Sequence, residues 1–152
     1  MNEEIKEKNS VDEYREFIKG TKIKNITLKK LETIKISAPE DGIWEYEMKT
    51  DFHLDRYEGN TLYILAKFNV IARNKKNKEK NDDNESRLFE IEILFNIEYH
   101  NPSGTELSEK DRDRFLHTNV PLNVWPYARE LISSLTTRMG YPPLLILPFK
   151  VY

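Results

Sequence analysis

The side chains that could carry acid–base or metal chemistry are few and far apart in this sequence of 152 residues. None of the three histidines, His53, His100 and His117, has a second His, Asp or Glu at the spacing of a zinc site. Glu90 and Glu92 stand two residues apart, which places both carboxylates on one face of a strand. They could form a carboxylate site, but a charged and solvated strand face explains them more simply.

Motifs that bind nucleotides or activate a nucleophile do not occur in the sequence. Neither G-x-x-x-x-G-K-S/T nor G-x-G-x-x-G is present, and no serine stands in a nucleophile elbow. The sequence contains no cysteine, which excludes disulfides and thiolate chemistry. We therefore expect a protein that is not an enzyme and that uses no cofactor and no metal.

The charged residues are numerous but balanced. They make up 33% of the sequence and leave a net charge of −2, which does not favour a nucleic-acid partner. The alternative function that stays open is single-stranded nucleic-acid binding through sheet aromatics and a Lys-rich loop with Lys75, Lys76 and Lys78. The N-terminus is too polar for a signal peptide and no apolar run approaches the roughly 20 residues of a membrane span, so we expect a cytoplasmic protein.

Three segments alternate strictly between apolar and polar residues, as strands with one wet face do. The apolar positions run from Trp44 to Leu54, from Leu62 to Ala72 and from Phe89 to Tyr99. The turn 55–60 and a polar hairpin loop at 74–86, which we expect to be flexible, are too short for a crossover helix. With a weaker fourth strand within 26–36, the sequence predicts an α+β fold with a four-stranded antiparallel meander.

The N-terminal part differs in composition from the rest. Residues 1–9 are charged and aperiodic, so we expect a disordered segment there and a single domain over 10–152. Ser10 and Glu13 form a capping-box pattern, which predicts a short helix that ends at Gly20.

Two helices are predicted in the C-terminal third. Ser108 caps a short one that runs through Leu116, and Pro126 opens a longer one that Gly140 ends. The longer helix carries two stripes at helical spacing. They are Ala128, Ile132, Leu135 and Met139, and beside them Tyr127, Leu131, Ser134 and Arg138. One stripe is enough to cover a sheet, so the second stripe needs another partner, and a second subunit is the economical one.

The stretch VWPYARELISS at 124–134, with GYPPLLILP at 140–148, closely resembles the SecB family of bacterial chaperones. In that family an aromatic-Pro-Tyr-Ala-Arg-Glu motif opens the main helix. A Gly-x-x-Pro follows, and then an apolar segment that ends in Pro. The three alternating segments before the motif are similar in order and spacing to the family's strands.

The resemblance implies an antiparallel sheet with the long helix packed on one face, in a homo-oligomer (dimer or tetramer) formed through the helix. Family members are ATP-independent holdases that keep client proteins unfolded, for export through the SecA motor or, in some relatives, to guard an antitoxin. The implied client-binding groove consists of Trp44, Met48, Phe52, Leu88 and Tyr127. The implied oligomer interface consists of Leu131, Ser134, Leu135 and Arg138. Glu90 is similar in position to a sheet acid that contacts the motor.

The sequence also departs from the family pattern. After the apolar segment it has no counterpart of the family's second helix or of the Cys/His zinc tail that docks on SecA. We therefore expect a short form of the family without the zinc tail and without membrane insertion. Its partners are then unfolded clients, together with either an antitoxin or the SecA motor.

Overall fold

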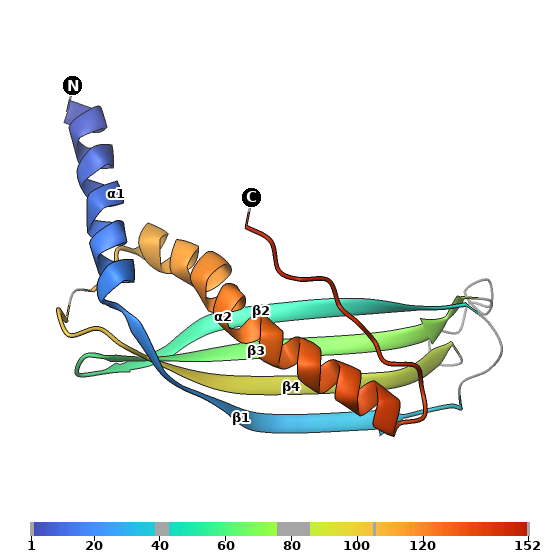
Figure 1. Ribbon diagram of the computed structural model, residues 1–152. Helices are drawn as coiled ribbons and strands as arrows, with labels where there is room; N and C mark the ends of the chain where they lie inside the picture. The colour runs from blue at the N-terminus through green and yellow to red at the C-terminus, as the bar shows by residue number, and fades with distance from the viewer. Residues whose placement is uncertain (1, 39–42, 76–85, 105, 152) are drawn as a thin grey trace.

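The computed structural model describes residues 2–38, 43–75, 86–104 and 106–151, with the side chains of the first helix described from Val11 onward. These residues form two helices and a four-stranded sheet (Figure 1). The elements in chain order are α1 (Asn2–Gly20), β1 (Lys22–Lys35), β2 (Trp44–Glu58), β3 (Thr61–Asn74), β4 (Arg87–His100) and α2 (Glu109–Arg138).

The four strands form one antiparallel sheet in the order β1-β4-β3-β2. The strands β2, β3 and β4 follow one another as the predicted meander, so the antiparallel sheet is confirmed. The fourth strand, β1, pairs with β4 and not with β2, its neighbour along the chain. It is also longer than the segment 26–36 of the sequence prediction, because β4 offers it partners along almost its whole length.

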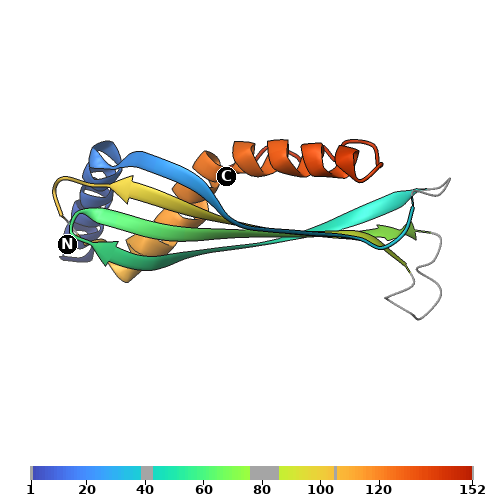
Figure 2. The same ribbon diagram turned by 90° about the horizontal axis from the view of Figure 1, so that it is seen from below.

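The alternating pattern of the sequence appears directly as alternating burial. In β3 every second side chain from Leu62 to Ala72 is buried, and the buried positions of β4 likewise include every second residue from Phe89 to Tyr99. We call the face that carries these residues, which α2 covers, the inner face, and the opposite one the outer face. Figure 2 shows α2 on one side of the long, twisted sheet.

One helix, α2, replaces the two that the sequence predicted in this region. It runs without interruption over Glu109–Arg138, whereas the sequence predicted one helix to end at Leu116 and another to begin at Pro126. Ser108 caps the start as predicted. Pro121 and Pro126 lie inside the helix and lack an N–H, so α2 bends along this stretch (Figure 2) instead of ending. Packing of the helix against the inner face outweighs the two lost hydrogen bonds.

The end of α2 is closed as the sequence predicted. Gly140 has a positive φ of 89°, and its N–H donates to the carbonyl of Thr137. The N–H of Tyr141 donates to the carbonyl of Thr136 over 3.0 Å, which completes a Schellman motif. The chain then reverses and runs back beside α2 as an irregular stretch, the C-terminal segment 141–151 (Figure 1).

The helix α1 is longer than predicted. It begins at Asn2, whereas the sequence predicted a disordered segment over 1–9 and a helix start at Ser10. Glu and Lys dominate this stretch and are good helix formers, so the helix extends beyond the capping-box pattern. Met1 lies outside the described residues.

Only the last turns of α1 reach the body of the protein. The Phe17 ring meets the Phe115 ring of α2 edge-on, with 5.5 Å between ring centres. The Tyr14 hydroxyl donates to Asn119 Oδ1 over 2.8 Å. The rest of α1 projects away from the sheet (Figure 1).

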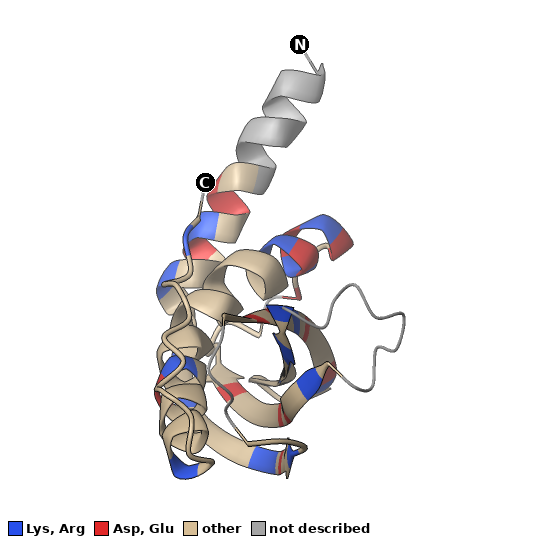
Figure 3. Ribbon diagram, turned by 90° about the vertical axis from the view of Figure 1, so that its right-hand side faces the viewer, with Lys and Arg blue, Asp and Glu red and all other residues tan. Residues whose placement is uncertain are grey.

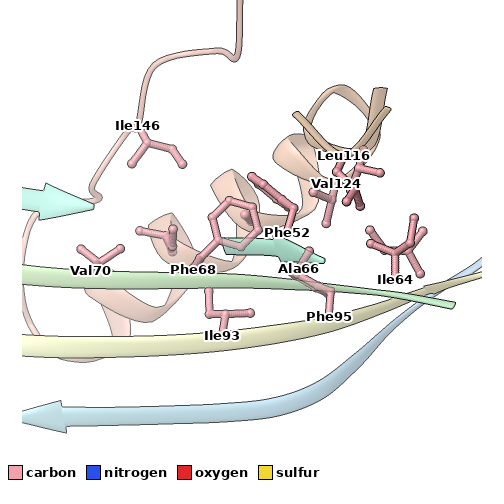
Figure 4. Close-up of a cluster of buried hydrophobic side chains, with 14 of the residues drawn as sticks. Phe52, Ile64, Ala66, Phe68, Val70, Ile93, Phe95, Leu116, Val124 and Ile146 are labelled. Atoms are coloured by element: carbon pink, nitrogen blue, oxygen red, sulfur yellow. The ribbon is translucent and has the colours of Figure 1, made fainter. Parts of the chain in front are cut away.

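The hydrophobic core lies between the inner face and α2 (Figure 4). Phe68 of β3 stands at its centre, because its ring contacts the rings of Phe52, Phe95 and Trp125 at centroid distances of 5.8, 6.2 and 5.6 Å. Among the described residues, neither helix is long and apolar enough to cross a membrane.

Candidate binding surface

Three of the five predicted groove residues lie together on β2. Trp44 and Met48 are half-buried, and Phe52 is buried. All three pair with inner-face positions of β3, so their side chains lie on the covered side of the sheet. Leu88, the fourth predicted residue, is also buried, near the start of β4. The three side chains of β2 thus form an apolar floor of the inner face, not an open groove, and Leu88 lies at an irregularity of β4 beside inner-face Phe89.

Tyr127, the fifth predicted residue, is separated from that floor. It is 53% exposed and lies two positions after Trp125, whose ring packs on Phe68. Two residues turn a helix by about 200°, so Tyr127 and Trp125 point in nearly opposite directions. The structure therefore does not bring Tyr127 together with the residues of β2.

The C-terminal segment covers much of the β2 side of the inner face, which the sequence analysis did not foresee. The Tyr141 ring meets the Trp44 ring edge-on, with ring centres 6.1 Å apart, and the centre of the Phe149 ring lies 5.2 Å from that of Trp125. Ile146 reaches toward the strand face that carries Phe68 and Val70 (Figure 4). No sequence motif predicts the alternating burial of this segment. Its run of aliphatic residues did indicate that part of it would be buried.

The opposite side of α2 leaves apolar side chains uncovered. On β1, Leu28 and Leu31 pair with inner-face residues of β4, yet they are 48% and 39% exposed. On α2, Leu131 and Leu135 are half-buried and lie on the flank away from the C-terminal segment. We call these four residues, together with Tyr127, the β1-side surface.

The predicted interface residues of α2 all lie on this flank or on the outward side of the helix. Leu131 and Leu135 belong to the β1-side surface, Ser134 is half-buried and Arg138 is exposed. Their role in oligomerisation stays a prediction, because it concerns a second chain.

The outer face of the sheet carries many charged side chains, and several of them are paired. The Glu90 carboxylate accepts a hydrogen bond from Arg87. Glu92 lies 2.7 Å from Lys30 Nζ and 3.3 Å from Lys67 Nζ, and the hydrogen bonds from these two ammonium groups lower the pKa of its carboxyl. Figure 3 shows residues of both signs along the sheet and the helices. The two glutamates are thus members of ion pairs between strands or along one, not an acid–base pair.

The three histidines lie on the surface and do not form a cluster. His53 Nδ1 stands 3.3 Å from Asp51, and His117 Nδ1 stands 3.2 Å from Asp113. Within the part of the chain that the structure describes, no group of three or more His, Asp or Glu lies close enough to hold a metal ion.

The sheet aromatics do not suit the nucleic-acid alternative. In the described strands most of them lie on the inner face, beneath α2 and the C-terminal segment, where bases cannot stack on them. Tyr63 is on the outer face, and the guanidinium of Arg56 already lies 3.9 Å over its ring. Of the predicted flexible loop 74–86, residues 76–85 lie outside the described residues.

The fold and the surface together define a binding protein: a sheet whose inner face is apolar and only partly covered by one helix. Comparison with known proteins identifies its family. The family model "Preprotein translocase subunit SecB" matches residues 18–151, so the chain belongs to the SecB family. SecB proteins are chaperones, which supports the expectation of a non-enzymatic function and lends no support to nucleic-acid binding.

Individual relatives agree with this assignment. The protein-export protein SecB of Neisseria meningitidis serogroup B is 29% identical over 115 residues, which cover 73% of this chain and 68% of that protein. The protein-export protein SecB of Caulobacter sp. is 38% identical over 64 residues, 42% of this chain and 37% of that protein. The chain thus spans about two thirds of the length of the first relative and less than half of the second.

A solved structure shares the fold. The SecB-like chaperone Rv1957 of Mycobacterium tuberculosis, determined in complex with a ChAD peptide from the HigA1 antitoxin, superposes with a TM-score of 0.76. The match covers 89% of this chain and 94% of that one, at 15% sequence identity. At this identity the likeness concerns the fold.

Proposed function

We propose that this protein is an ATP-independent holdase chaperone that binds unfolded protein segments. The observation that carries the proposal is the β1-side surface, where Leu28, Leu31 and Tyr127 are 48%, 39% and 53% exposed in the single chain. Exposed apolar side chains on one side of a protein are typical of interaction sites where they form a patch. Membership of a chaperone family supports the same conclusion.

The physical requirements of a holdase fit this surface. Apolar contact is not directional and contributes about 25 cal/mol per Å² of buried area, so many different segments can bind weakly. Several such sites on one oligomer then raise the effective affinity by avidity. Neither effect needs a catalytic group or a nucleotide.

The same proposal includes a homo-oligomer, either a dimer or a tetramer. A second copy that covers Leu131, Ser134, Leu135 and Arg138 would remove the half-buried leucines of α2 from water. The edge strand β1 borders this flank and carries its own exposed leucines. We expect clients to use the apolar surface that the assembly leaves open, with Tyr127 as its exposed aromatic residue. Trp44, Met48, Phe52 and Leu88 would act as the apolar floor of the proposed groove.

Two client roles are consistent with the family, namely export and the guarding of an antitoxin. The Mycobacterium relative, which was determined with an antitoxin peptide, supports the second role through its fold alone. Contact of Glu90 with the SecA motor would have to compete with its pairing to Arg87, so we expect that contact to be weak. As a SecB-family chaperone the protein would act in the cytoplasm.

The holdase proposal is tested by light scattering from a chemically denatured client that aggregates on dilution, without nucleotide. The wild-type protein should suppress aggregation at near-stoichiometric ratios. Tyr127→Ala should require several-fold more protein for the same protection, whereas Leu122→Ala should not. Leu122 is a matched control because it is also an exposed apolar residue of α2, 48% exposed, and helix phase turns it away from the sheet, nearly opposite the buried Val124. No protection by the wild type at any ratio would contradict the proposal.

A further inference from the structure

The C-terminal segment has the form of a bound peptide. Its aliphatic residues alternate: Leu144 and Ile146 are 7% and 1% exposed, whereas Leu145 and Leu147 are 70% and 77% exposed. Two-residue alternation is the pattern of an extended chain with one face docked. The segment is therefore an extended apolar strap that lies on the inner face beside α2.

Three side chains of α2 hold the backbone of this strap. Arg129 Nε donates to the carbonyl of Ile146 over 2.8 Å, and Trp125 Nε1 donates to the carbonyl of Leu147 over 2.7 Å. The N–H of Leu144 donates to Thr136 Oγ1 over 2.9 Å. Bonds to backbone atoms carry no sequence information, so any extended segment could accept them.

The strap has no sheet hydrogen bonds to hold it. Within the described residues, no backbone-to-backbone hydrogen bond joins residues 142–151 to another element. Pro142, Pro143 and Pro148 lack an N–H and cannot pair in the interior of a sheet. Release of the strap would therefore break apolar contacts and hydrogen bonds with side chains of α2, but no hydrogen bonds between strands.

The surface beneath the strap is aromatic and aliphatic and includes Trp44 of the apolar floor described above. Trp44 and Phe89 face Tyr141, with ring centres 6.1 and 4.8 Å from it. Ile146 reaches toward Phe68 (Figure 4), the centre of the core. If the strap left, this floor would become an open trough along α2, with Arg129 and Trp125 at its wall as backbone-binding donors.

We propose that the segment 141–151 is a resident occupant of a client site, and that an unfolded client segment displaces it. This inference rests on the proposed holdase function and names the ligand class of the site. The ligand is an extended segment with aliphatic or aromatic side chains two residues apart, whose carbonyls accept from Arg129 and Trp125.

Displacement sets a threshold for binding. The strap is tethered to α2, so its effective concentration at the site is high. The apparent affinity for a client is the intrinsic affinity reduced by the fraction of molecules in which the strap is released. Only segments that bury as much apolar surface as the strap, or that are held by avidity, then bind. Short or polar segments of folded proteins are excluded.

Hydrogen exchange on the full chain gives the direct test. The probe is a reduced and alkylated globular protein, which is permanently unfolded, at saturating concentration. The amide of Leu144, which donates to Thr136 in the docked strap, should exchange faster with the probe bound than without it, because the strap has left its site. Slower or unchanged exchange while the probe binds would overturn displacement and leave the holdase function intact.

A pair of double variants tests the same proposal by affinity. Leu144→Ser with Ile146→Ser removes the docked side chains, and we expect it to bind the unfolded probe at least about tenfold more tightly than wild type. Leu145→Ser with Leu147→Ser changes only exposed side chains and should stay within about twofold. If the outward pair weakens binding and the inward pair does not strengthen it, the outer side of the strap is the client surface and the proposal is wrong.

A variant that leaves the core untouched covers the case in which the inward pair unfolds. Pro142→Gly with Pro143→Gly changes two exposed residues and raises the conformational entropy of the released strap. It should raise affinity for the same probe by about fivefold. Unchanged or weaker affinity of a folded variant would contradict displacement. Failure of every protein, wild type included, to bind the probe would instead contradict the holdase function.

Discussion

Burial in the fold shifts the ionisation of Tyr99 strongly. Its ring is 2% exposed, and its hydroxyl accepts a hydrogen bond from Asn123 Nδ2 over 2.9 Å. Burial raises the pKa of Tyr99 from 10.0 to about 12. The buried phenol therefore keeps its proton in a pH range in which the unfolded chain loses it.

This shift predicts a loss of stability in alkali. Below pH 10 the Tyr99 phenol is neutral in both the folded and the unfolded chain, so its contribution to the free energy of unfolding is fully present. Between pH 10 and about 12 only the unfolded chain ionises, so stability falls by up to about 1.4 kcal/mol per pH unit. Urea unfolding from about pH 9 to pH 11.5 measures the slope. Tyr99→Phe should be less stable than wild type near neutral pH, because Asn123 loses its partner, and should show a shallower alkaline slope. An identical slope in the variant would refute the assignment.

At the scale of elements, the two flanks of α2 differ in how far they are covered. One flank, with Trp125 and Arg129, holds the C-terminal segment. The other carries Leu131 and Leu135 beside the exposed leucines of β1. Of the first stripe, Ala128 and Ile132 are buried against the sheet, whereas Leu135 shares the less covered flank with Leu131 of the second stripe.

The turn at Gly140 sets the direction in which the C-terminal segment leaves α2. Its φ of 89° is unfavourable for residues with a Cβ, so Gly140→Ala should lower the free energy of unfolding by about 1–2 kcal/mol. Urea denaturation measures the change. Gly20→Ala is the matched control at the end of α1, because a Cβ there would meet Asn101 at an ordinary 3.7 Å. Equal effects of the two substitutions would show that the positive φ is not the cause.

The whole molecule is predicted to be incomplete as a monomer. Leu131→Glu places a carboxylate on the β1-side surface, so it should reduce the assembled mass measured by multi-angle light scattering at micromolar concentration. Leu145→Glu is the control, because Leu145 is 70% exposed on the other side of α2 and should leave the mass unchanged. A wild-type protein that elutes as a monomer would contradict the interface.

The sequence by itself determined the features that depend on a few neighbouring residues. Strict alternation from Trp44 to Tyr99 predicted three antiparallel strands, because the side-chain period of a strand is a local property. Ser108 and Gly140 marked the ends of α2 correctly, because capping involves only the adjacent turn. The motif at 124–134 indicated the family, which the family model confirms.

Only the tertiary structure decided how these pieces share the inner face. Local rules predict that a helix begins at Pro126, but packing on the sheet lets α2 continue through this residue with a bend. Helix phase separates Tyr127 from the aromatic floor of β2, and the C-terminal segment occupies that floor. These outcomes depend on which apolar surfaces meet across long sequence distances. The free energy of burying apolar surface over the whole fold determines which surfaces meet, and no short sequence pattern contains that information.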